Sequence, residues 1–145
     1  MKSAFRNAGF TLLELVIVLA IVSVLAAIVY PRYTEYVEDA RRTEVQGDIM
    51  LLASSLETYR SQNLTYGGAE LSVLAPTLDA HDFYSVSLNQ DPLPSGAQNY
   101  EIRALPKTGT MMDGTGAMKL NSEGQSCWSE TNQSDCTYGS DKSWN

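Results

Sequence analysis

Few residues in this chain of 145 amino acids are of a type that could catalyse a reaction. His81 is the single histidine, and it stands beside Asp82 in a stretch that we expect to be a loop. A serine hydrolase built on His81 would place its nucleophile on a sharp turn, and the sequence contains no Gly-x-Ser-x-Gly segment to form one. We interpret His81 as a loop side chain that faces solvent, so the sequence predicts no catalytic residue and no enzyme.

The glycines and the metal-binding residue types do not predict a cofactor site. Gly109, Gly114 and Gly116 do not connect a strand to a helix, which a phosphate-binding loop requires. Asp113 and Asp135 do not stand at the spacing of a calcium loop. Two cysteines and one histidine are too few to complete a zinc site. We therefore expect neither a cofactor nor a metal.

The charge balance argues against a polyphosphate as the main partner. The chain carries 17 acidic and 10 basic side chains, a formal net charge of -7, whereas DNA binding depends on clustered Lys and Arg. A local patch of Arg103, Lys107 and Lys119 could still contact DNA, with Tyr100 or Trp128 stacking on bases. We favour the simpler interpretation that these cations solubilise an exposed face.

One long apolar segment separates this sequence from an ordinary soluble domain. Residues 10–30 contain a single charge, Glu14, and two other hydrophilic side chains, Thr11 and Ser23. About 20 residues at 1.5 Å per residue match the roughly 30 Å hydrocarbon core of a bilayer. A core helix is the alternative, but about 115 residues remain after the segment, too few to cover it on every side. The segment is therefore predicted to span a membrane.

The charges on either side of the segment predict its orientation. Lys2 and Arg6 precede it, whereas acidic residues follow Arg32. By the positive-inside rule the N-terminus stays cytoplasmic and the C-terminal body is exported. A cleaved secretory signal would have a shorter apolar region, usually roughly 7 to 15 residues.

Glu14 stands out because it lies inside the apolar segment. A carboxylate at the centre of a bilayer costs about 2.5 to 3.5 kcal/mol on insertion scales, so such a residue is a functional candidate by default. The alternative is a carboxylate near the helix end that reaches the membrane interface.

The start of the apolar segment carries a specific motif. Residues 9–14, Gly-Phe-Thr-Leu-Leu-Glu, precede an unbroken apolar helix, and this combination resembles the processing site of type IV prepilins. The resemblance implies that a prepilin peptidase cleaves after Gly9 and that the new N-terminal residue, Phe10, is N-methylated. It also implies that Glu14 pairs with the N-terminal amine of a neighbouring subunit during assembly.

Beyond the membrane segment the sequence predicts an α+β head. Pro31 predicts a kink or local melting of the helix, because proline lacks a backbone donor. Alternating or apolar runs at 83–88, 99–105 and 117–120 predict three or four antiparallel strands and no second helix. The sheet would pack on an apolar stripe of the helix, formed by Tyr33, Val37, Ala40, Val45, Ile49, Leu52, Leu56 and Tyr59.

Cys127 and Cys136 are the only cysteines. Export to an oxidising compartment favours a disulfide between them, and the eight intervening residues allow normal disulfide geometry. Metal ligation is the rival interpretation, and two thiols alone do not complete a ligand set.

The order of segments along the whole chain is similar to that of type IV pilins, with a long kinked helix packed on an antiparallel sheet. Residues 41–46, 56–60 and 66–69 look most like minor pilins of Gram-negative pili. The resemblance divides the chain into a leader, 1–9; a membrane and filament-core helix, 10–30; and a head, 31–145, comprising an amphipathic helix, 31–60, a loop and sheet, 61–126, and a disulfide region, 127–145.

The function implied is that of a structural subunit of a type IV pilus, contributing to assembly, twitching motility, adhesion or DNA uptake. The implied partners are prepilin peptidase, other pilin subunits, the inner-membrane assembly platform and, before assembly, the lipid bilayer. The subunit would sit in the inner membrane and then in the extracellular pilus. The alternatives are a pseudopilin of a type II secretion system and a pilus-tip or DNA-binding module, DNA being the less favoured partner.

Overall fold

The computed structural model describes residues 10–144, which belong to two compact units, Met1–Val37 and Glu38–Asn145. Helix α1 (Leu12–Asn63) begins in the first unit and ends in the second. The helix is continuous through Pro31, so local melting is not observed there. The kink at Pro31 stays a prediction.

In the second unit, α1 buries one stripe of side chains against the sheet. Val45, Ile49, Leu52 and Leu56 recur every three or four residues, are at most 1% exposed and belong to the main hydrophobic core. This part of the predicted stripe is confirmed. Arg42 is also buried, at only 8% exposure, although it is a charged residue.

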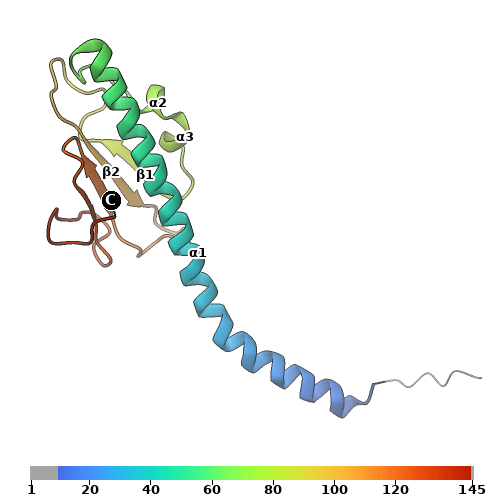
Figure 1. The fold of residues 1–145 in the computed structure, drawn as a ribbon. Helices are drawn as coiled ribbons and strands as arrows, with labels where there is room; N and C mark the ends of the chain where they lie inside the picture. The colour runs from blue at the N-terminus through green and yellow to red at the C-terminus, as the bar shows by residue number, and fades with distance from the viewer. Residues whose placement is uncertain (1–9, 145) are drawn as a thin grey trace, which may run out of the picture. The chain divides into compact units, whose positions relative to one another are not determined.

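The sheet is an antiparallel meander of four strands in the order β1-β2-β3-β4, beside the C-terminal half of α1 (Figure 1). The strands are β1 (Tyr84–Leu88), β2 (Glu101–Pro106), β3 (Met118–Asn121) and β4 (Ser126–Trp128). Along β1 the buried Tyr84, Val86 and Leu88 alternate with exposed serines, as expected for a strand with one face on the core. The α+β class and the three predicted strands are confirmed, and β4 is the optional fourth.

The expectation that no second helix follows α1 is wrong. Two single-turn helices, α2 (Leu71–Leu74) and α3 (Pro76–Asp79), lie between α1 and β1. Leu71 and Leu78 insert into the core, and Pro76 begins α3 at a position where its missing donor is not needed. A single turn is too short to show the helical period, so the sequence pattern could not reveal these elements.

At Gly116 the backbone lies in close contact with the backbone of Ser129, just after β4. Gly116 has a φ of 88°, and a Cβ there would lie 1.5 Å from the carbonyl oxygen of Ser129. The backbone at Gly116 and the backbone at Ser129 can approach this closely only if residue 116 has no side chain.

We predict that Gly116→Ala destabilises the head by well over the roughly 1 to 2 kcal/mol that left-handed backbone strain alone would cost. Gly114→Ala is the matched control, because Gly114 has a φ of 89° but nothing within 4 Å of its ideal Cβ. Denaturant unfolding followed by tryptophan fluorescence reports on the head, since Trp128 and Trp144 both belong to the second unit. Equal losses for the two variants would contradict the clash.

Candidate functional site: apolar helix and disulfide region

The first unit exposes an almost continuous apolar helix surface. The most apolar stretch of α1 has a mean hydropathy of 3.0 and none of it is buried, and the helix is long and apolar enough to cross a membrane by length and composition. Leu12 is 81% exposed and Ile21 is 56% exposed. Because so much apolar surface is unfavourable in water, this helix needs lipid or other apolar helices around it. The predicted hydrophobic N-terminal helix is confirmed.

Glu14 takes part in the N-terminal cap of this helix. The backbone N–H of Glu14 donates to Thr11 Oγ1 at 3.2 Å, and the backbone N–H of Thr11 donates to Glu14 Oε2 at 3.5 Å. This reciprocal pair is a capping box. The spacing Thr-x-x-Glu in the sequence is the signature of this cap. The Glu14 carboxylate therefore also satisfies the Thr11 N–H, while the Thr11 hydroxyl satisfies the Glu14 N–H.

The predicted processing site lies only partly within the described residues. Gly9 falls outside them, whereas Phe10 is the first described residue and is 80% exposed. Cleavage after Gly9 and methylation of Phe10 stay predictions.

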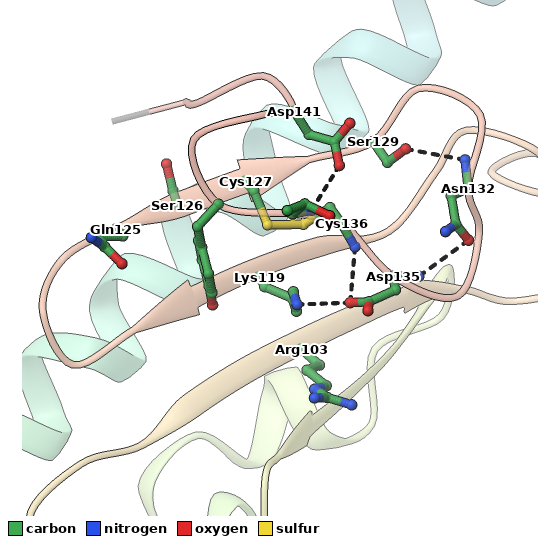
Figure 2. Close-up of a disulfide and its surroundings, with 12 residues drawn as sticks. Arg103, Lys119, Gln125, Ser126, Cys127, Ser129, Asn132, Asp135, Cys136 and Asp141 are labelled. Atoms are coloured by element: carbon green, nitrogen blue, oxygen red, sulfur yellow. Dashed lines mark hydrogen bonds and ion pairs between the residues drawn. A yellow bond between two sulfur atoms is a disulfide. The ribbon is translucent and has the colours of Figure 1, made fainter.

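The disulfide predicted between Cys127 and Cys136 is confirmed (Figure 2). Cys127 is fully buried on β4 and Cys136 is 2% exposed. The bridge attaches the loop after β4 to the sheet, with a Cα–Cα distance of 5.9 Å. Asn132 organises the tip of the loop, because its Oδ1 accepts the backbone N–H of Ser134 at 3.0 Å.

Lys119 is a buried cation beneath the same loop. Its side chain is 9% exposed, and its Nζ lies 2.7 Å from Asp135 Oδ1 and 3.9 Å from Glu101 Oε2. Figure 2 shows Lys119 pointing at Asp135 from the sheet. The Tyr138 ring lies beside it, with Nζ 5.0 Å from the ring centroid. Since a buried ammonium needs compensating charge, Lys119 holds the disulfide loop on the sheet.

The suggested DNA patch is not a set of free cations. Arg103 stands opposite Lys119 in the β2–β3 register, and its Nε lies 2.6 Å from Glu101 Oε1. Lys107 Nζ donates to the His81 carbonyl oxygen at 2.7 Å. Arg103 and Lys107 remain exposed at the surface, whereas Lys119 is buried, so the three side chains do not form one open cationic surface.

The two suggested stacking rings are also occupied. Tyr100 is 4% exposed, and its hydroxyl donates to Glu57 Oε1 at 3.4 Å. The guanidinium of Arg42 lies 3.9 Å from the centre of the Trp128 ring. Trp128 Nε1 donates to the Thr115 carbonyl oxygen at 2.9 Å. Both rings are therefore engaged in packing within the head rather than free to stack on bases.

The expectation that His81 simply faces solvent is wrong. The side chain is half-buried, and its Nδ1 accepts the backbone N–H groups of Phe83 and Tyr84, both at 3.1 Å. This arrangement requires the tautomer with an unprotonated Nδ1. His81 therefore caps the entry into β1.

Ionisation in the head follows burial and pairing. The hydrogen bond from Lys119 is the main cause that lowers the pKa of Asp135. Burial is the main cause that raises the pKa of Tyr100 and of Tyr138, and nearby Glu57 and Glu101 respectively add to it. Both phenols therefore stay protonated and can donate to these carboxylates.

An apolar N-terminal helix, an antiparallel meander and a C-terminal loop closed by a disulfide together define the pilin class of protein. Residues 31–119 match the family described as "Type IV minor pilin ComP, DNA uptake sequence receptor", and residues 5–30 match the prokaryotic N-terminal methylation motif. The chain belongs to this family of type IV minor pilins.

Individual relatives agree with this class. The chain is 36% identical to type II secretion system core protein G of Pectobacterium carotovorum subsp. carotovorum, over 63% of this chain and 65% of that protein. It is 49% identical to the type IV major alpha-pilin of Moraxella bovis, over 28% of this chain and 26% of that protein. These matches span less than two thirds of either relative's length.

The fold is also similar to a solved structure. The crystal structure of the Neisseria meningitidis non-core minor pilin PilV superposes with a TM-score of 0.55 at 23% identity, covering 68% of this chain and 93% of that one. This likeness supports the pilin fold.

We predict that Asp135→Asn destabilises the head by about 1 to 2 kcal/mol at neutral pH, because buried Lys119 loses its nearest countercharge. The pKa of Asp135 is lowered in the folded state, so its contribution is present above the ordinary aspartate pKa and is lost as pH falls through the folded value. The stability difference between wild type and variant should therefore shrink in acid.

Unfolding followed by tryptophan fluorescence between pH 7 and pH 2 measures this difference. Glu123→Gln is the control, since Glu123 is exposed and forms no ion pair among residues 10–144. A difference between wild type and Asp135→Asn that did not change with pH would contradict the proposed pairing.

Proposed function

We propose that this minor pilin is a non-catalytic structural subunit that is held first in the inner membrane and later in the filament by the same apolar helix. The observation that supports this most strongly is the exposed apolar surface of α1, of which the most apolar stretch is 0% buried. Lipid covers that surface before assembly, and the helices of neighbouring subunits cover it afterwards.

The processing steps belong to this proposal. Prepilin peptidase removes residues 1–9 by cleaving after Gly9, and Phe10 becomes the methylated N-terminus. The match of residues 5–30 to the N-terminal methylation motif supports both steps. Lys2 and Arg6 keep the leader cytoplasmic, so the head is exported and the subunit passes from the inner membrane to the pilus. The inner-membrane assembly platform and other pilin subunits are its partners.

Glu14 supplies the charge that guides assembly. Its carboxylate accepts the Thr11 N–H through Oε2, and a carboxylate has a second oxygen that can accept from another donor. The amine at the N-terminus of a neighbouring subunit is that donor. In an apolar filament core an unpaired carboxylate or ammonium is costly, so the pairing selects subunits in the correct axial position.

We predict that Glu14→Leu inserts into the membrane normally but enters sheared surface filaments at least about tenfold less than wild type, since loss of a buried charge partner costs more than about 1.4 kcal/mol. Glu14→Gln keeps an oxygen for the cap but lacks the charge, and it should show the same defect. Immunoblots of membrane and sheared fractions measure both steps. Normal incorporation of either variant would refute the charge-pairing role.

A pseudopilin of a type II secretion system is the alternative within the same class. The similarity to core protein G of several secretion systems supports it, whereas the match of residues 31–119 to a minor pilin family supports the pilus. Sheared surface filaments decide between them, because a pilus subunit should be recovered there.

Reception of DNA is a second candidate function, favoured by the family description of a DNA uptake sequence receptor. Among the suggested cations, Arg103 and Lys107 are exposed and Lys119 is buried. Only the first two could exchange their present partners for phosphates, which limits the electrostatic contribution to binding.

We predict weak DNA binding that falls roughly tenfold between about 50 and 200 mM salt, as two phosphate contacts imply. Arg103→Ala combined with Lys107→Ala should abolish it, and Lys142→Ala is the control, because Lys142 is an exposed, ion-paired cation like Arg103 but is not one of the suggested contact residues. Gel shifts of the purified protein measure these effects. Absence of salt-sensitive retardation would remove this candidate.

A further inference from the structure

The eight tyrosines of this chain fall into two groups that differ in hydrogen bonding. Each tyrosine of the second compact unit has a hydroxyl partner within the protein; these residues are Tyr59, Tyr66, Tyr84, Tyr100 and Tyr138. Among the described residues, the hydroxyls of Tyr30, Tyr33 and Tyr36 have no such partner. Their side chains are 72%, 64% and 72% exposed.

The three unpartnered tyrosines stand directly at the end of the apolar segment. Residues 12–29 form 18 helical positions without a charge other than Glu14. At 1.5 Å per residue they extend about 27 Å, close to the hydrocarbon thickness of a bilayer. A helix that fills the hydrocarbon with this segment therefore places Tyr30 at its boundary and Tyr36 about 9 Å further along the axis.

The spacing of these tyrosines puts them on one side of the helix. Residues three apart differ by about 60° around an α-helix, so Tyr30, Tyr33 and Tyr36 cover an arc of about 120°. Arg32 lies next to this arc, at about 40° from Tyr36. A tyrosine has an apolar ring and a polar tip, and an arginine has an apolar stem and a charged head, which are the properties found at membrane interfaces.

We propose that Tyr30, Tyr33 and Tyr36 form an interfacial anchor that lies in the phospholipid headgroup region on the exported side of the inner membrane. The proposal rests on the membrane-anchored state proposed above and adds the residues that fix the depth of the helix. The rings lie against the upper acyl chains, and the hydroxyls donate to ester and phosphate oxygens. Arg32 reaches the phosphates beside them.

Packing on a neighbouring subunit is the other partner that exposed tyrosines could have. The bilayer suits this segment better because Arg32 and Glu35 interrupt the tyrosines, and a headgroup layer solvates such charges whereas an apolar helix bundle does not. The match between the length of residues 12–29 and the hydrocarbon thickness also points to the lipid boundary.

The test measures the depth of the helix in vesicles of phosphatidylethanolamine and phosphatidylglycerol that contain the full chain. Val29→Cys introduces a single reactive thiol for a fluorescent probe, since Cys127 and Cys136 are in a disulfide and the described chain has no free cysteine. Lipids that carry a quencher at two depths locate the probe. We expect it about 15 Å from the bilayer centre, half the hydrocarbon thickness.

Replacing all three tyrosines by serine should move the probe outward by about one helical turn, roughly 5 Å, because Arg32 and Glu35 then draw the helix toward water. Replacing all three by tryptophan is the matched control and should keep the wild-type depth. Unfolding of the head, followed by the native tryptophans in wild type and the serine variant, should be the same in both.

Three results would overturn the proposal. An unchanged probe depth in the serine variant, with normal quenching in wild type, would overturn the interfacial anchor alone. The same unchanged depth together with reduced incorporation into filaments would assign the tyrosines to contacts between subunits. No quenching of the wild-type probe by lipid at either depth would overturn the anchor and the membrane-anchored state together.

Discussion

The rest of this molecule depends on an apolar helix surface that its own chain does not cover. Side chains such as Leu12, Ile21 and Val29 are more than half exposed, and no residue of α1 before Arg42 is buried. Because the hydrophobic effect opposes leaving this area in water, the subunit is stable only in contact with lipid or with other apolar helices. The proposed transfer from the bilayer to the filament satisfies this constraint at both stages.

In the head, a small sheet packs on one apolar stripe of α1. Four aliphatic residues of α1, from Val45 to Leu56, supply the stripe. Two buried cations fasten the C-terminal region. Lys119 binds Asp135 of the disulfide loop. Arg42 lies on the Trp128 ring, and its Nη1 lies 2.5 Å from Asp39 Oδ1. These two cations thus serve the internal structure of the head.

Pilins and secretion pseudopilins share this division of labour, so the helix alone does not separate them. Similarity to core protein G and to a major pilin is compatible with either machine. The match of residues 31–119 to a minor pilin family includes most of the sheet, and it is this region that distinguishes the chain. The same apolar helix would suit either machine.

The sequence by itself determined the membrane-length helix, the prepilin motif, three strands and the disulfide, because each depends on local composition or on a fixed spacing. The Thr-x-x-Glu spacing of the Thr11–Glu14 capping box is likewise local. Only the tertiary structure decided that Arg42 and Lys119 are buried, since the Trp128 ring and the carboxylates of Glu101 and Asp135 lie far from them along the chain. The His81 contacts are local, to the N–H groups of Phe83 and Tyr84, but no sequence motif specifies them. A charged side chain is expected to be exposed unless a carboxylate or an aromatic ring pairs with it in the fold. When that partner is distant in the sequence, no local pattern predicts the pairing.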